Sequence, residues 1–162
     1  MRILITGGNG YVGRNLTRLL YPSHDVCVVD NLRYGASRFR PDEMDRFTLE
    51  TVDITDGDAV AATVAGFEPD VIVHLAAIHY IPECERRPTA TASTNIAGTV
   101  ALLAAAPARC RFVFASSGAV YRPDDVPHDE VESELLPDDV YGLSKLQGEQ
   151  WVRHFAPRRG LS

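Results

Sequence analysis

The 162-residue chain contains few cysteines, no excess of positive charge and no long apolar run. Its three cysteines, Cys27, Cys84 and Cys110, are odd in number and lack the spacing of a zinc site, so we expect reduced thiols and a cytoplasmic protein. A net charge of −6 argues against a nucleic-acid-binding surface. No apolar segment reaches the length of a membrane span, and Met1 leads into an apolar strand pattern rather than a signal peptide.

The most informative pattern lies in the first thirteen residues. The apolar residues Ile3, Leu4 and Ile5 predict a buried strand, which is followed by the glycine-rich turn 7–10 and by a helical pattern with Gly13 in its first turn. A strand, a glycine turn and a helix in this order are typical of a site for a dinucleotide pyrophosphate. Glycine permits close approach of the backbone, and the helix N-terminus offers unpaired N–H groups and a positive dipole end.

Asp30 ends the second apolar run, 26–29, near the distance of about 20 residues expected for the acid that binds the adenosine ribose. A carboxylate there would repel the 2′-phosphate of NADP, so the sequence favours NAD over NADP. The nearby cations Arg14 and Arg33 could soften that preference. The alternative interpretation of Asp30 is a solvated acid in the loop after a strand.

Strand and helix patterns alternate along the chain. Strands are predicted over 2–6, 26–30, 46–52, 71–75 and 111–116, and helices over 11–21, 57–66, 88–106 and 141–156, the last ending before Pro157. We expect a polar loop over 31–45, a solvated loop over 84–87 and an acidic, proline-containing flap over 122–139 whose carboxylates are too scattered for a metal site. Continuous apolar strands separated by helices predict an α/β fold with one doubly wound, Rossmann-like parallel sheet, and 1–162 as one dinucleotide-binding domain.

A second group of polar residues follows the last predicted strand. Ser117 lies at its end, and Tyr141 and Lys145, four apart on a helix, share one face. An ammonium near a phenol lowers the phenol pKa from about 10, which makes Tyr141 a candidate general base. The Ser117 hydroxyl could hold the substrate oxygen. Taken alone, a Tyr-x-x-x-Lys pair is also common as an ordinary surface pair.

Together these motifs resemble the N-terminal part of an extended short-chain dehydrogenase/reductase, of the NAD-dependent sugar-nucleotide epimerase/dehydratase group. The matching segments follow the family's order and cover nearly the whole chain. They are Thr6–Gly13, Asp30–Leu32, Asp53–Ile54, His74–Ala77, Asn95 within Asn-Ile-Ala-Gly-Thr, Ser116–Ser117 before Val120–Tyr121, and Tyr141 with Lys145.

The resemblance implies NAD as the cofactor and a role for each matching position. Gly7, Gly10 and Gly13 would bind the pyrophosphate, with backbone contacts from Tyr11 and Val12. Asp30 and Asn31 would hold the adenosine ribose, Asp53 and Ile54 would contact adenine, and Leu75, Ala76 and Ala77 would pass under the middle of the cofactor. Ser117 and Tyr141 would be catalytic, and Lys145 would bind the nicotinamide ribose and tune Tyr141. Asn95 would support the active site, and we expect His74 to be a buried structural residue.

The implied function is that of an NAD-dependent epimerase, or a related oxidoreductase, acting on a nucleotide sugar through a transient keto intermediate. Many dehydratases of the family carry an Asp-Glu pair where this chain has Gly118 and Ala119, which favours epimerisation or simple oxidoreduction. Family members are usually longer, so we expect the last sheet strands and the C-terminal substrate domain to be absent from this chain. The alternative is an NAD-binding module, or half of a split enzyme, without catalysis of its own. An open sheet edge predicts a homodimer or a complementing chain.

Overall fold

The fold is built on one parallel sheet, seen here in a computed structural model that describes residues 1–123 and 127–162. In the described residues the strand order is β3-β2-β1-β4-β5, and every pairing is parallel. The strands are β1 (Arg2–Thr6), β2 (Asp25–Asp30), β3 (Thr48–Thr51), β4 (Val71–His74) and β5 (Arg111–Phe114). The chain runs outward from β1 to β3 and then returns to β4, so the strand order reverses between β1 and β4. The predicted doubly wound sheet is therefore confirmed.

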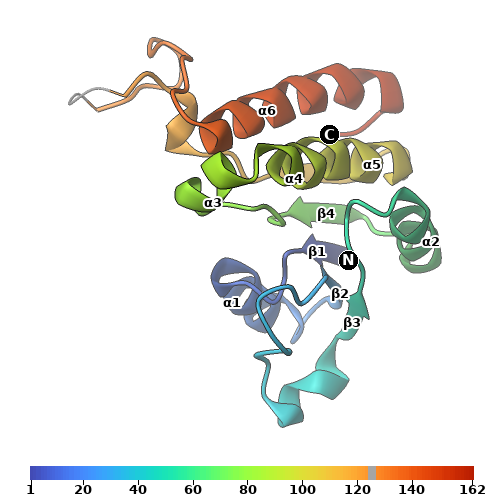
Figure 1. Cartoon of the computed structure of the whole chain (residues 1–162). Coiled ribbons are helices and arrows are strands. Elements are labelled where there is room, and N and C mark those ends of the chain that lie inside the picture. The colour runs from blue at the N-terminus through green and yellow to red at the C-terminus, as the bar shows by residue number, and fades with distance from the viewer. Residues whose placement is uncertain (124–126) are drawn as a thin grey trace.

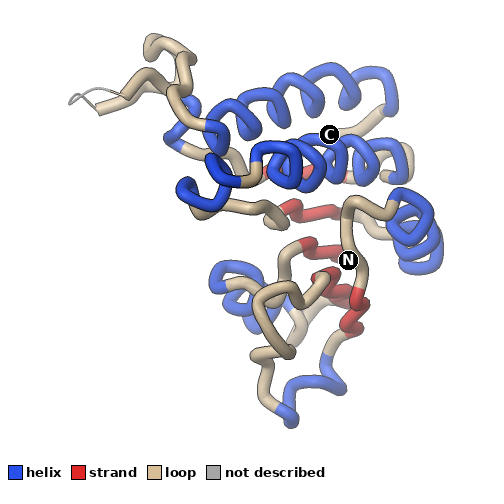
Figure 2. Tube along the Cα trace, viewed as in Figure 1, coloured by secondary structure: helices blue, strands red, loops and turns tan. Residues whose placement is uncertain are grey.

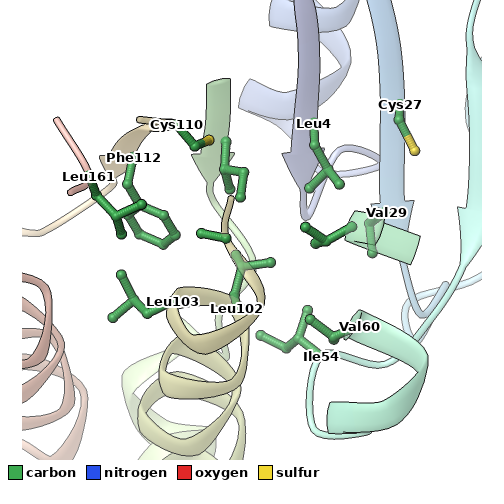
Figure 3. Close-up of a cluster of buried hydrophobic side chains, with 13 residues drawn as sticks. Leu4, Cys27, Val29, Ile54, Val60, Leu102, Leu103, Cys110, Phe112 and Leu161 are labelled. Carbon is green, nitrogen blue, oxygen red and sulfur yellow. The ribbon is translucent and has the colours of Figure 1, made fainter. Parts of the chain in front are cut away.

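Helices cover both faces of this sheet (Figure 1). Leu4 belongs to the larger core cluster, formed with residues of α2 (Gly57–Phe67), α5 (Gly98–Ala105) and α6 (Val140–Arg159). Ile3 and Ile5 point to the opposite face and pack with residues of α1 (Tyr11–Leu20). Figure 3 shows the larger cluster, to which β1 contributes Leu4 and α5 contributes Leu102. In the described part of the chain, no helix is both long and apolar enough to cross a bilayer.

The residues after α6 return to the sheet beside β5. Leu161 is buried in the larger core cluster (Figure 3). The Ser162 N–H donates to the Cys110 carbonyl at 3.2 Å, and the Phe112 N–H donates to the Ser162 carbonyl at 2.9 Å. Because these two bonds flank Arg111 in the pattern of a parallel ladder, the chain at Ser162 runs parallel to β5.

Two expectations for loops were wrong. The segment 31–45 contains most of the 3-10 helix η1 (Pro41–Arg46), drawn below the sheet in Figure 2. Its buried Glu43 accepts hydrogen bonds from the Arg40 N–H at 2.8 Å and from Arg18 of α1 at 2.7 Å. The ion pair with Arg18 thus fixes a segment that the sequence predicts to be a polar loop. The segment 84–87 is not a solvated loop either, because it overlaps helix α3 (Ile81–Arg86) and the Cys84 side chain is fully buried.

The helix predicted over 88–106 consists of three parts: α4 (Pro88–Ala92), the π-helical turn η2 (Ser93–Ala97) and α5. The expectation that the last helix ends before Pro157 was also wrong. α6 continues through Pro157 to Arg159 and ends at Gly160, whose φ is 64°. Phe155 and Ala156 pack on the larger core cluster, and this tertiary packing outweighs the low helix propensity of proline.

Candidate functional site

The glycine turn joins β1 to α1 in a conformation that only glycine tolerates. Gly7 has φ of 69°, and a Cβ there would lie 2.7 Å from the Ala76 nitrogen. A Cβ on Gly13 would lie 2.5 Å from the Gly8 Cα, so the start of α1 presses directly on the turn. Gly10 is the N-cap residue of α1, and no side chain of the described residues caps this helix. The first-turn N–H groups are therefore open to an anionic ligand.

The exposed start of α1 carries two further predicted residues. The exposed fraction is 79% for Tyr11 and 61% for Val12, so neither side chain is part of the core. Both residues lie in the first helical turn, and their predicted role, which uses the backbone rather than the side chains, stays a prediction.

The predicted adenosine residues come together beside this turn, at the carboxyl ends of β2 and β3. Asp30 accepts hydrogen bonds from the Asn9 N–H at 3.0 Å and the Leu32 N–H at 2.9 Å, which fixes its carboxylate next to the glycine turn. Asn31 donates to the Asp53 carboxylate at 2.8 Å. Burial alone raises the pKa of Asp53, but hydrogen bonds from Thr55 and Asn31 outweigh it and hold the pKa below its usual value. Both carboxylates are thus oriented acceptors.

The segment Leu75–Ala77 follows β4 and passes the glycine turn. The Leu75 N–H donates to the Thr6 carbonyl at 3.1 Å, and Ala76 is the residue that Gly7 approaches. Ile54, the second predicted adenine residue, is buried against Gly98 of α5, where an added Cβ would lie 2.7 Å from the Ile54 Cδ1. The Ile54 side chain thus belongs to the larger core cluster, whereas Leu75–Ala77 lies against the glycine turn.

Ser117 and Tyr141 meet at the carboxyl end of β5. Ser117 is the N-cap residue of the short 3-10 helix η3 (Gly118–Val120), and Tyr141 lies in the first turn of α6. These two elements touch so closely that a Cβ on Gly142 would lie 2.2 Å from the Ala119 carbonyl oxygen. Burial raises the pKa of Tyr141 above its ordinary value, although a hydrogen bond with the Ser117 side chain acts in the opposite direction.

Lys145 lies one turn further along α6, with 3% of its surface exposed. Its Nζ donates to the Ala115 carbonyl at 2.9 Å and lies 5.9 Å from the centre of the Tyr141 ring. Burial lowers the pKa of Lys145 to about 8. The structure thus differs from the expectation that Lys145 lowers the pKa of Tyr141, because the ammonium is directed to a backbone carbonyl and burial dominates at the phenol.

His74 is buried, as expected, at the end of β4. Its Nδ1 is 2.6 Å from the Thr6 Oγ1, and its Nε2 is 2.8 Å from the Thr99 Oγ1. Thr99 in turn donates to the Asn95 carbonyl at 2.7 Å. The ring therefore connects β1, which enters the glycine turn, with the helical path between β4 and β5. The sequence alone assigned neither threonine a role, although Thr6 directly precedes the glycine turn and Thr99 ends the segment Asn-Ile-Ala-Gly-Thr.

Asn95 extends this connection to the catalytic helix. Its side chain exchanges two hydrogen bonds with the Ile78 backbone, at 2.8 and 2.9 Å, and donates to the Ser144 hydroxyl at 2.9 Å. Ser144 donates to the Tyr141 carbonyl at 2.7 Å. Ser144 was also missed, although it stands next to Lys145 in the sequence. Among the described residues, no group of three His, Cys, Asp or Glu side chains could hold a metal ion.

Comparison with known proteins agrees with this geometry. A family model described as the NAD dependent epimerase/dehydratase family matches residues 3–162. The chain belongs to this family. It is 34% identical to the UDP-glucose 4-epimerase of Rhizobium meliloti (strain 1021), over 98% of the chain and 48% of the relative. It is 33% identical to dTDP-glucose 4,6-dehydratase 1 of Escherichia coli (strain K12), over 99% of the chain and 52% of the relative.

A solved structure extends the likeness to three dimensions. The UDP-glucose 4-epimerase of Thermus thermophilus in complex with NAD superposes with a TM-score of 0.86 at 27% identity, covering 99% of this chain and 52% of that one. The chain thus spans about half the length of the relatives that it matches. NAD is the cofactor of the family, and the residues present here fit it. The glycines let the turn pack closely on the backbone, no side chain of the described residues caps the start of α1, and Asp30 stands beside the turn.

Proposed function

We propose that this chain forms the NAD-binding and catalytic part of an epimerase that acts on a nucleotide sugar through a transient keto intermediate. The observation that supports this proposal is the position of Ser117, Tyr141 and Lys145. These three side chains lie at the same edge of the sheet as the glycine turn, because β1, β4 and β5 are parallel and their carboxyl ends face one crevice.

In this proposal the chain positions the sugar and moves its proton. Ser117 holds the reacting hydroxyl by a hydrogen bond, and the Tyr141 oxygen takes the hydroxyl proton and later returns it. Bound NAD supplies a reversible hydride acceptor for the sugar carbon. Because burial raises the pKa of Tyr141, a positive charge must approach the phenol before it can act as a base. The Lys145 ammonium can provide it by turning away from the Ala115 carbonyl.

Epimerisation is favoured over dehydration by the residues that follow Ser117. Elimination of water needs an additional acid and base next to the reacting carbon. Gly118 and Ala119 carry no ionisable group, and both lie in η3, directly beside the start of α6. Relatives of both kinds match the chain, so the distinction depends on these two positions.

The test is Tyr141→Phe, assayed with UDP-, GDP- and dTDP-sugars in the presence of NAD. We expect the variant to bind NAD like the wild type and to lose at least about a hundredfold in turnover, because the phenol proton carrier is gone. Tyr21→Phe is the matched control, since Tyr21 packs on Phe47 on the opposite face of the sheet. Wild-type turnover by Tyr141→Phe would contradict the proposed role.

A second candidate is an NAD-binding module or half of a split enzyme, which has no activity on its own. The fact that favours it is that the chain spans only about half the length of its relatives. Uptake of NAD without turnover of any sugar in the panel would support this candidate. Turnover by the chain without a complementing protein would exclude it.

We also propose that the protein forms a homodimer in the cytoplasm. The three cysteines are all free and buried, which suits the reducing cytoplasm.

A groove of about 570 Å³ between the α4–α5 path and Trp151 of α6 supports the homodimer, because no charged residue lines it in the described chain. Light scattering at high protein concentration tests the dimer, and a monomer throughout would contradict it. A heteromeric complex would instead identify a complementing chain.

A further inference from the structure

The edge of the sheet at which we propose that NAD binds is bordered by a closed series of contacts. On one side Gly7 touches Ala76, so the glycine turn meets the segment after β4. On the other side Asn9 of the same turn accepts the Arg38 N–H at 2.9 Å and thereby holds the loop after β2. The loop after β2 and the segment after β4 therefore flank the glycine turn, separated by two strand spacings, or roughly 10 Å.

Glu83 of α3 joins these two flanks. Its carboxylate forms an ion pair with Arg33 and accepts a hydrogen bond from the Tyr34 hydroxyl at 3.2 Å. Arg87 lies 3.7 Å from the same carboxylate. Arg33 and Tyr34 belong to the loop after β2, directly after the adenosine residues Asp30 and Asn31, whereas Glu83 follows β4. This contact completes the border opposite the glycine turn.

Both ends of the contact are held by the rest of the fold. On the adenosine side, the Arg33 N–H donates to the Asn31 side chain at 3.1 Å. On the other side, Glu85 of α3 accepts the Val140 N–H at 2.8 Å, at the first residue of the catalytic helix α6. The remaining borders consist of covalent chain, of close backbone packing at Gly7, and of exposed hydrogen bonds that each include a backbone N–H. The Glu83 contact is made by side chains alone, so it is the part that can open at least cost.

We propose that the contact of Glu83 with Arg33 and Tyr34 is a clasp across the crevice that slows the passage of NAD in both directions. This inference rests on the binding of NAD by the chain. Because the clasp is made of partly exposed side chains, it can open without moving the sheet or the glycine turn. It acts on the rate of exchange, and it leaves the residues that hold the bound cofactor unchanged.

The test is Glu83→Gln, with NAD exchange followed by stopped-flow fluorescence. The protein is loaded with 1,N6-etheno-NAD and mixed with excess NAD for release, or mixed with the fluorescent analogue for uptake. We expect both rates to rise about five- to tenfold, which corresponds to about 1–1.4 kcal/mol, while Kd changes little. Arg33→Gln should give the same increase, and the double variant should add nothing further.

The matched control is Asp42→Asn, which also removes one negative charge. Asp42 is exposed and pairs with Arg40 at 3.6 Å, away from the Glu83 contact. Its rates should equal those of the wild type. Unchanged rates in Glu83→Gln would overturn the clasp. Slower release with tighter binding would also overturn it, because Glu83 would then act only by repelling the phosphates.

A second measurement separates the clasp from the proposed function. If the wild type takes up no NAD, the proposed function fails, and hydrogen exchange of the cofactor-free protein then decides on the clasp. Glu83→Gln should raise amide exchange in 31–38 and leave α2 unchanged. Equal exchange in 31–38 in the variant and the wild type would overturn the clasp independently of NAD.

Discussion

Protonation of His74 should make the protein sensitive to mild acid. The ring is 1% exposed and burial lowers its pKa from 6.5 to about 3. The Thr99 hydroxyl donates its proton to the Asn95 carbonyl, so the hydroxyl oxygen must accept a hydrogen bond from Nε2–H of His74. Nδ1 of His74 therefore accepts a hydrogen bond from the Thr6 hydroxyl. Both ring positions are therefore already assigned, and an added proton on Nδ1 would face another donor without solvent.

The sign follows from the two pKa values of His74. Between pH 6.5 and 3 the unfolded chain binds a proton that the folded chain does not, so stability falls as the pH is lowered through this range. At about 1.36 kcal/mol per pKa unit, the loss at pH 5 is about 2 kcal/mol relative to neutral pH. It approaches about 5 kcal/mol near pH 3. This is a large fraction of a typical folding free energy.

Urea unfolding at pH 7 and pH 5 measures this effect. His74→Gln should start less stable at pH 7, because the threonines lose partners, but should lose about 2 kcal/mol less than the wild type between the two values. His79→Gln is the control: His79 is exposed, and its variant should keep the wild-type pH dependence. The reasoning is refuted if His74→Gln keeps that dependence. NMR titration of the His74 ring near pH 6.5 would refute it equally.

Two further predictions concern packing. Thr17→Val should leave stability unchanged or raise it by about 1 kcal/mol, because the buried Thr17 hydroxyl has no hydrogen-bond partner among the described residues; a clear drop in the urea midpoint would contradict this. Gly142→Ala should separate the turn at Ala119 from α6 and cost about 1–3 kcal/mol in unfolding experiments. The control Gly66→Ala, where an added Cβ meets nothing within 4 Å, should instead stabilise helix α2 by about 0.5–1 kcal/mol. Equal effects of the two alanines would show that the contact with Ala119 does not matter.

The sequence predicts the sheet and the glycine turn well, because both follow from short-range patterns. The apolar run of β1 leads into a turn in which Gly7 and Gly13 have no room for a side chain. The apolar run of β2 leads to Asp30, and its carboxylate is indeed bonded to the turn at Asn9. In each case residues close in sequence determine the local conformation, and parallel pairing brings the strand ends to one edge.

The details that the sequence could not predict depend on contacts between distant segments. The sequence suggests a solvated loop at Cys84. In the structure this segment is part of α3, whose Glu85 bonds to α6 and whose Glu83 pairs with the loop after β2. The path of α6 through Pro157 depends on core packing. The Lys145 ammonium is directed to the Ala115 carbonyl, thirty positions earlier in the chain, and no local spacing indicates this choice.

The π-helical turn at Ser93–Ala97 limits how this fold can be re-engineered. A single residue beyond the α-helical count rotates everything after it by about 100°. Within the turn, Asn95 bonds to the Ile78 backbone and so supports the active site. After the turn, Gly98 packs against Ile54, and Thr99 bonds to His74. Deleting one residue would restore a regular helix and misdirect one of these two faces. Shortening the helix by one residue would therefore cost either the active-site support or the packing on the sheet.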